Sequence, residues 1–181
     1  MKLASPPEIL LFDRALAGVL RSAQNGMLPP FALTLGLPRN EWHLLVEQSG
    51  SSVGASIDET RFVFLRSAIP QTFRDLVDLL TDNASPASDL LRTRWAAHVV
   101  ATACFGDRHL WEELGLSGGS DVSMLLDHYF QPLHQRNTAN LRWKRFLFLE
   151  LGARHGETEK RPPGCARCGD FPLCFGDSRQ G

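Results

Sequence analysis

The chain has 181 residues, of which 43% are hydrophobic and 22% charged, a composition typical of a soluble globular protein with a sizeable core. Its formal net charge of -1 gives no global basic field, which argues against a nucleic-acid partner. No stretch reaches roughly 20 apolar residues, and Glu8 and Asp13 interrupt the first segment, so we expect neither a membrane span nor a signal peptide. These features predict a cytoplasmic protein.

Helical periodicity dominates the chain and predicts an all-α fold. Ser85 followed by Pro86, and Ser120, have the residue types that begin helices as N-caps. Residues 62–65 have the composition of a strand, but a single strand would have no partner, so we doubt it. The predicted helices are 8–24, a short one after Pro38, one from near Pro70 to Leu80, one from Ser85 to about Cys104, one from Ser120 to about Leu133 and one from about Thr138 to Ala153.

The helical pattern stops after Gly152. Residues 154–181 hold charges, glycines, Pro162-Pro163 and three of the four cysteines. Loops are also expected earlier in the chain, at 49–56 and 117–120, which are rich in Ser and Gly. The segment 154–181 has too few apolar residues to form a core alone. We therefore predict a single helical domain over 1–153 and an irregular, metal-ordered C-terminal tail over 154–181.

The tail cysteines form the pattern C-x2-C-x5-C, made by Cys165, Cys168 and Cys174. Clustered thiols in a chain without a secretory signal indicate metal binding rather than disulfides. Soft thiolates select zinc, copper(I) or iron–sulfur clusters. A structural zinc ion needs four ligands, and the tail adds only His155 to the three cysteines, so spacing alone leaves zinc and iron–sulfur equally possible.

The charge is unevenly distributed. Residues 136–174 carry eight basic and four acidic side chains, a local net charge of +4 that could attract an anion or an acidic partner. The alternative is an ordinary solvated helix face with a charged tail. For three other residues we expect a structural role rather than a role in metal binding: Cys104 as a small buried residue, His98 as a hydrogen-bonded core histidine and His109 as part of a helix start.

Three blocks of the sequence resemble the NifQ family, the nitrogen-fixation proteins that handle molybdenum for the iron–molybdenum cofactor. They are Ala103-Cys104-Phe105-Gly106-Asp107-Arg108-His109-Leu110-Trp111-Glu112-Glu113-Leu114-Gly115-Leu116, then Asn137-Thr138-Ala139-Asn140-Leu141-Arg142-Trp143-Lys144-Arg145-Phe146, and the cysteine block that ends at Cys174-Phe175-Gly176. The resemblance implies an iron–sulfur cluster that incorporates molybdenum and donates it during cofactor assembly. It also implies the nitrogenase iron protein and the cofactor-assembly scaffold as partners.

The chain departs from the family pattern C-x4-C-x2-C-x5-C at its first position, where Lys160 stands. Gly152 also stands where family members tend to carry a cysteine. On this resemblance we expect a metallocluster carrier rather than a turnover enzyme, with Cys165, Cys168 and Cys174 as its ligands. The alternatives are a zinc-stabilised helical protein-interaction module and a cluster-dependent enzyme with an open iron site.

Overall fold

The computed structural model describes residues 7–50, 57–158 and 160–176, and its regular elements there are all helices, which confirms the predicted all-α fold. Most of the loop expected at 49–56 lies outside these ranges. The elements are α1 (Pro7–Gln24), η1 (Pro30–Thr34), α2 (Arg39–Ser49), α3 (Glu59–Ser67), α4 (Gln71–Asp82), α5 (Leu90–Ala103), α6 (Leu110–Glu113), α7 (Gly119–Tyr129), α8 (Gln131–Arg136), α9 (Trp143–Arg154), η3 (Cys165–Arg167) and α10 (Phe171–Phe175).

Helix α5 is the centre of the fold. Every residue from Trp95 to Cys104 is buried, and the helix packs against α1, α4 and α6. A helix that is apolar on most of its faces is stable only when other helices surround it. Small residues, Ala96, Ala97 and Ala101 among them, let those neighbours approach closely. The buried side chains of the helices form one continuous hydrophobic core.

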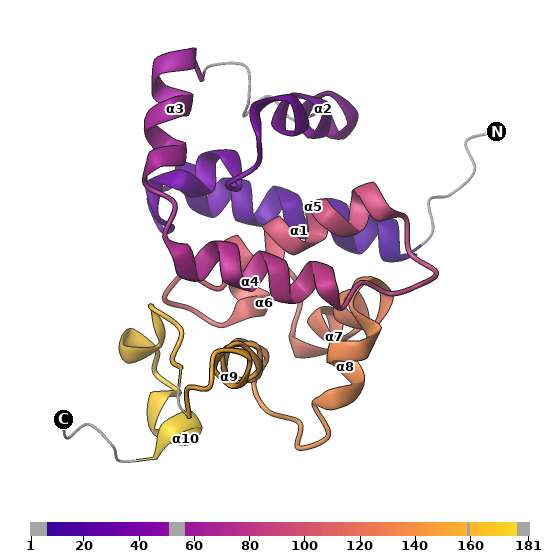
Figure 1. Ribbon diagram of the computed structural model, residues 1–181, viewed down its shortest axis with the longest axis vertical. Helices are drawn as coiled ribbons and strands as arrows, with labels where there is room; N and C mark the ends of the chain where they lie inside the picture. Colours follow the sequence, from indigo (N-terminus) through magenta and orange to yellow (C-terminus); the bar gives the residue numbers. More distant parts are fainter. Residues whose placement is uncertain (1–6, 51–56, 159, 177–181) are drawn as a thin grey trace.

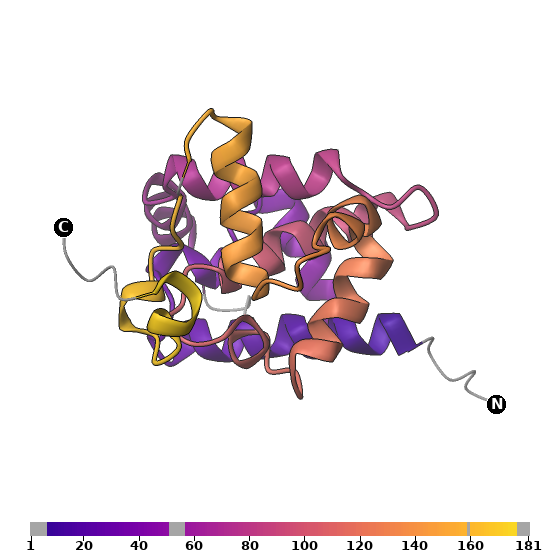
Figure 2. The same cartoon turned by 90° about the horizontal axis from the view of Figure 1, so that it is seen from below.

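The helices are stacked in three tiers in Figure 1: α2 and α3 at the top, α1, α4 and α5 in the middle, and α7, α8, α9 and the tail at the bottom. Seen from below, α9 lies between the tail on one side and α7 and α8 on the other (Figure 2). Two contacts fix the end of α9 to α4: an ion pair of Arg154 with Asp82 at 2.7 Å, and the ring of His155 at 3.7 Å from the carboxylate of Asp75. None of the helices described is long and apolar enough to cross a membrane.

Residues 62–65 lie within α3 and form no strand, in line with the sequence expectation. The predicted start of the fourth long helix at Ser85 is wrong. Helix α5 begins at Leu90, because the side chain of Asp89 accepts a hydrogen bond from the Arg92 amide at 2.8 Å and caps the helix. Ser85 serves a different helix: its hydroxyl accepts a hydrogen bond from the Gln131 amide at the start of α8.

The apolar pattern from Val122 to Leu133 predicts one helix, but the structure has two. The backbone turns at Phe130, where φ is -137°, and α8 begins after it with a proline in its first turn. Gly118, and not Ser120, is the N-cap of α7. The apolar periodicity of the sequence continues across this break because both helices direct their apolar residues into the same core.

Helix α9 begins at Trp143, five residues later than the predicted start at Thr138. The side chain of Asn137 makes two hydrogen bonds with the backbone of Leu141, both 2.9 Å long, and Asn140 adopts a φ of +48°. An asparagine that bonds the backbone in this way stabilises a turn against a helix. The turn places the first residues of α9 at the edge of the pocket described next.

Candidate metal centre

Cys165, Cys168 and Cys174 all line one pocket of about 400 Å³, next to the start of α9. Four separate segments form its walls: residues 108–111 around the start of α6, 119–123 at the start of α7, 140–145 at the start of α9, and the tail. The residue ranges that carry the family resemblance therefore converge on a single cavity. Its size is within the range of small-ligand sites, roughly 300–1,000 Å³.

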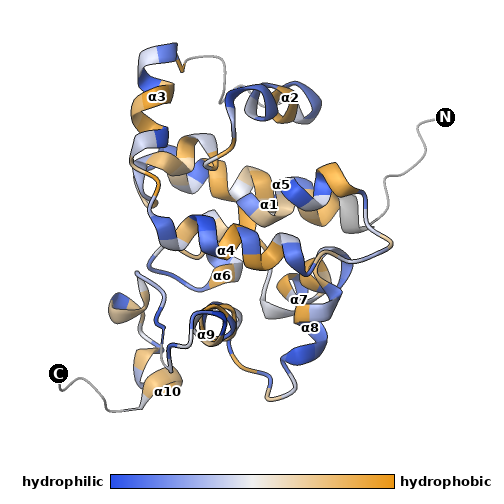
Figure 3. Ribbon diagram, viewed as in Figure 1, coloured by the Kyte–Doolittle hydropathy of each residue, from blue (hydrophilic) through white to orange (hydrophobic). Residues whose placement is uncertain are grey.

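The tail is held against the domain by a close backbone contact. Gly164 sits so near the turn after α5 that a Cβ placed on it would lie 2.1 Å from the Gly106 carbonyl oxygen. Only glycine allows this approach. Arg167 adds an ion pair to Asp107 at 2.7 Å, and Phe171 in α10 is buried. The short helix α10 is coloured towards the hydrophobic end of the scale in Figure 3.

Asp170 connects the tail to two other walls of the pocket. Its carboxylate lies 2.9 Å from the guanidinium of Arg142 at the start of α9 and 3.4 Å from the ring of His109 at the start of α6. His109 is thus both part of a helix start, where its amide donates to Glu112 at 2.9 Å, and a residue of the pocket wall. The prediction that His109 belongs to a helix start is confirmed. The contacts of Asp170 with His109 and Arg142 were not predicted from the sequence.

The thiols are in a partly dry environment. Burial raises the pKa of Cys165 to about 11, and the nearby ammonium of Lys144 offsets part of that effect. Burial also raises the pKa of Cys174, against the attraction of Arg142 and Arg145. A metal that binds here must therefore displace protons from the thiols, and the basic side chains reduce the cost of doing so.

Lys144 is a buried cation with no carboxylate partner among the described residues. Its side chain is 6% exposed, and its ammonium donates to the carbonyl oxygens of Gly106 at 3.0 Å and Arg108 at 2.5 Å. It fixes the turn after α5 to α9, and it directs one positive charge towards Cys165. A lysine on a helix with basic neighbours is expected in solvent, but the structure shows that the side chain of Lys144 is inside the protein.

Arg145 is a second basic residue of the pocket without a carboxylate among the described residues. Its guanidinium lies over the ring of Phe175 at 5.3 Å, and its Nε atom is buried with no hydrogen-bond partner among the described residues. Buried donors are normally paired, so this guanidinium is an exception. By contrast, Arg108 is paired with the buried carboxylate of Glu113 at 2.8 Å, which raises the pKa of Arg108.

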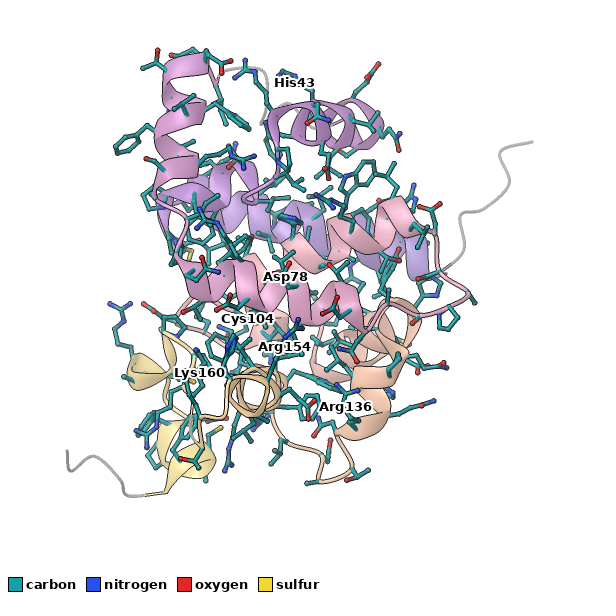
Figure 4. All side chains as sticks on the ribbon, viewed as in Figure 1. His43, Asp78, Cys104, Arg136, Arg154 and Lys160 are labelled. Carbon is teal, nitrogen blue, oxygen red and sulfur yellow. The ribbon has the colours of Figure 1, made fainter. Side chains whose placement is uncertain are left out.

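The two positions at which the chain departs from the family cysteine pattern lie against each other. A Cβ placed on Gly152 would be 3.2 Å from the Cβ of Lys160. Lys160 pairs with Glu157 at 3.3 Å and is not among the residues that line the pocket; Figure 4 labels it between α9 and the tail. His155, the other ligand considered for the tail, pairs with Asp75 on α4.

Cys104 is fully buried at the end of α5, as expected, and burial raises its pKa to about 12. It does not line the pocket, although it is close enough to Cys165 and Lys144 for their charges to act on it. In the part of the chain that the structure describes, no three Cys, His, Asp or Glu side chains are arranged closely enough to hold a single metal ion.

The fold and the pocket together define a class of protein: a helical domain whose tail brings three thiols into a cationic cavity. Comparison with known proteins identifies the family. The family model NifQ matches residues 15–176. The chain is 34% identical to Protein NifQ of Azotobacter vinelandii over 91% of its own length and 90% of that protein. It is also 25% identical to Protein NifQ of Klebsiella pneumoniae, over 80% and 87% of the two chains. No solved structure matches it.

The chain belongs to the NifQ family. The resemblance found in its sequence is therefore confirmed, and it extends to the N-terminal part of the chain. Membership implies a role in nitrogen fixation and in the processing of molybdenum.

Proposed function

We propose that this protein carries molybdenum on an iron–sulfur cluster bound by Cys165, Cys168 and Cys174, and donates it for the synthesis of the nitrogenase iron–molybdenum cofactor. One observation carries the proposal: the pocket places these three thiols beside Lys144 and Arg145, two cations that no described carboxylate neutralises. The protein acts as a carrier and not as a turnover enzyme.

The chemistry of the pocket fits such a cargo. Thiolates bind iron–sulfur clusters and molybdenum in its reduced, sulfur-seeking states. Thiolate ligands and sulfide give a cluster negative charge, and nearby cations stabilise a negative occupant in a partly dry site. The same cations would attract molybdate, an oxyanion.

An incomplete set of protein ligands suits a donor. Three thiols leave a coordination position for another ligand or for the acceptor protein, and Lys160 is not a pocket residue that would fill it. A carrier has to release its cargo, so a cage closed by protein on every side would be a disadvantage. The acceptors we propose are the cofactor-assembly scaffold and the nitrogenase iron protein.

Metal analysis of anaerobically purified protein tests the first half of the proposal. We expect brown protein that contains iron and acid-labile sulfide and that takes up molybdenum. Replacing Cys165, Cys168 and Cys174 together by Ser should abolish this, whereas Cys104→Ala, which alters a thiol outside the pocket, should not. Colourless wild-type protein with one firmly held zinc ion would reject the cluster and favour a zinc-stabilised interaction module.

A transfer assay tests the second half. Protein loaded with molybdenum is freed of molybdate and mixed with purified scaffold and nitrogenase iron protein. Cofactor synthesis should proceed with loaded wild-type protein and fail with the triple Ser variant. If free molybdate supports synthesis while the loaded protein does not, the donor role is wrong, and only a metal-binding protein remains.

A further inference from the structure

A second cavity, of about 350 Å³, lies away from the cysteines and shares no lining residue with the first. Its walls come from the turn after η1, the end of α3, one side of α4 and the middle of α5. Helix α4, on which Figure 4 labels Asp78, lies across the middle of the molecule, above α9 and the tail. Nothing in the molybdenum function uses this cavity.

Three guanidinium groups line the cavity. Arg94 is paired with Glu41 at 2.7 Å, but Arg66 and Arg74 have no ion pair with any described carboxylate. Asp78 contributes one negative charge to the lining, so the walls are positive in sum. Two unneutralised arginines in a concave site favour an anion, and the planar guanidinium is suited to carboxylates and phosphates.

His98 gives the cavity a hydrogen-bond acceptor. Its side chain is 6% exposed, and its Nδ1 lies 2.8 Å from the carbonyl oxygen of Leu35. A carbonyl oxygen can only accept, so Nδ1 carries the proton and Nε2 of the neutral ring is an acceptor. Burial and the charges of Arg94 and Arg66 lower the pKa of His98 to about 4, which keeps the ring neutral at physiological pH. Among the described residues, no group donates to Nε2.

The remaining wall is apolar. Phe73 is buried beneath the cavity, and Ile69 and Val77 contribute further carbon surface. A bare tetrahedral oxyanion would use the arginines but leave this wall without contacts. A ligand with two carboxylates, a hydroxyl and a short carbon skeleton would contact every wall of the cavity. Its carboxylates would pair with the two arginines that have no ion pair, its hydroxyl would donate to His98, and its carbon skeleton would contact the apolar wall.

We propose that this cavity binds a small hydroxylated dicarboxylate, with Arg66 and Arg74 pairing with its carboxylates and Nε2 of His98 accepting a hydrogen bond from its hydroxyl. The site is independent of the proposed cysteine-bound cluster. Its ligand recognition needs no metal and no change in oxidation state.

Calorimetric titration of the full-length protein with malate tests the proposal, with succinate as the matched dicarboxylate without a hydroxyl. Malate should bind, and succinate should bind roughly fivefold more weakly, as expected for one lost neutral hydrogen bond. Arg66→Gln should weaken malate binding roughly tenfold to a hundredfold, because a charge-assisted bond is lost. Arg61→Gln, an exposed arginine of the same helix that does not line the cavity, should have no effect.

Nuclear magnetic resonance of ¹⁵N-histidine-labelled protein gives a readout that needs no variant. Malate should shift the Nε2 resonance of His98, and succinate should not. Equal binding of malate and succinate, tighter binding of inorganic phosphate than of malate, or no malate binding would overturn the proposal. The triple Ser variant of the tail cysteines should bind malate like the wild type, so failure of the cluster proposal would be distinguishable from failure of this one.

Discussion

At the scale of single residues, the lowered pKa of His98 predicts how the stability of the protein depends on pH. Its pKa is lowered to about 4 by burial, whereas a histidine in an unfolded chain titrates near 6.5. Between these values the unfolded chain binds a proton that the folded protein does not. The free energy of unfolding should therefore fall as the pH drops through this window, by on the order of 3 kcal/mol in total.

Urea denaturation at about pH 7 and about pH 4.5, in buffers free of dicarboxylates, measures this dependence. His98→Asn is the informative variant, because asparagine keeps a donor for the Leu35 carbonyl but does not titrate. Its stability should change less over the same window than that of the wild type. Equal slopes for the two proteins would mean that other groups cause the pH dependence.

Lys144 is the second residue whose burial has a measurable consequence. Lys144→Met fills a similar volume but leaves the carbonyl oxygens of Gly106 and Arg108 without their donor. We expect a loss of about 2 kcal/mol of stability and a lower metal content, because the turn after α5 forms one side of the pocket. Thermal denaturation and iron analysis measure the two effects.

Lys160→Met is the matched control for Lys144→Met. Lys160 is paired with Glu157, does not line the pocket, and its side chain is 20% exposed. Its replacement should change stability by less than about 0.5 kcal/mol. If the two variants lose stability equally, burial of the Lys144 ammonium is not the cause.

At the scale of elements, the docking of the tail depends on Gly164. Gly164→Ala would place a methyl group against the Gly106 carbonyl, which cannot move without disturbing the end of α5. We expect the tail to leave its position and metal binding to be lost, while the helical core stays folded. Gly169→Ala is the control, because no atom lies within 4 Å of a Cβ at that position. Trypsin should cleave after Arg167 faster in the first variant only; equal cleavage would show that the contact does not hold the tail.

The sequence predicted most helices but not all of their ends. Apolar periodicity identified α1, α4 and α5 because each directs one regular set of side chains into the core. The start of α5 was missed because Ser85 has a capping side chain that caps another helix, 46 residues further along the chain. The start of α9 was missed because two hydrogen bonds of Asn137 outweigh the helical tendency of the residues that follow.

The candidate site was predicted only in part. The three cysteines were identified because thiols spaced in this way have few other uses, and the structure places them in one pocket. The role of Asp170 could not be found from the sequence, since its partners, His109 and Arg142, are distant in the chain. The buried position of Lys144 was missed because lysine on a helix is usually solvated.

At the scale of the whole molecule, the core does not depend on the tail. The buried apolar residues of α1 to α9 form one cluster without any contribution from the cysteine segment. Removal of the proposed cluster with a chelator should therefore leave the far-ultraviolet circular dichroism almost unchanged. Protease sensitivity of the tail should increase at the same time, because the cluster that we propose to order it is gone. Cooperative loss of helix on chelation would show that the metal stabilises the entire fold.

Three walls of the pocket precede the cysteines in the chain: residues 108–111, 119–123 and 140–145. A ribosome releases the chain from its N-terminus, so these walls emerge from it before Cys165 and the residues after it. The nascent protein therefore exposes its cluster of thiols only after these three segments have emerged. We expect this order to limit the capture of stray copper or zinc by the thiols during synthesis.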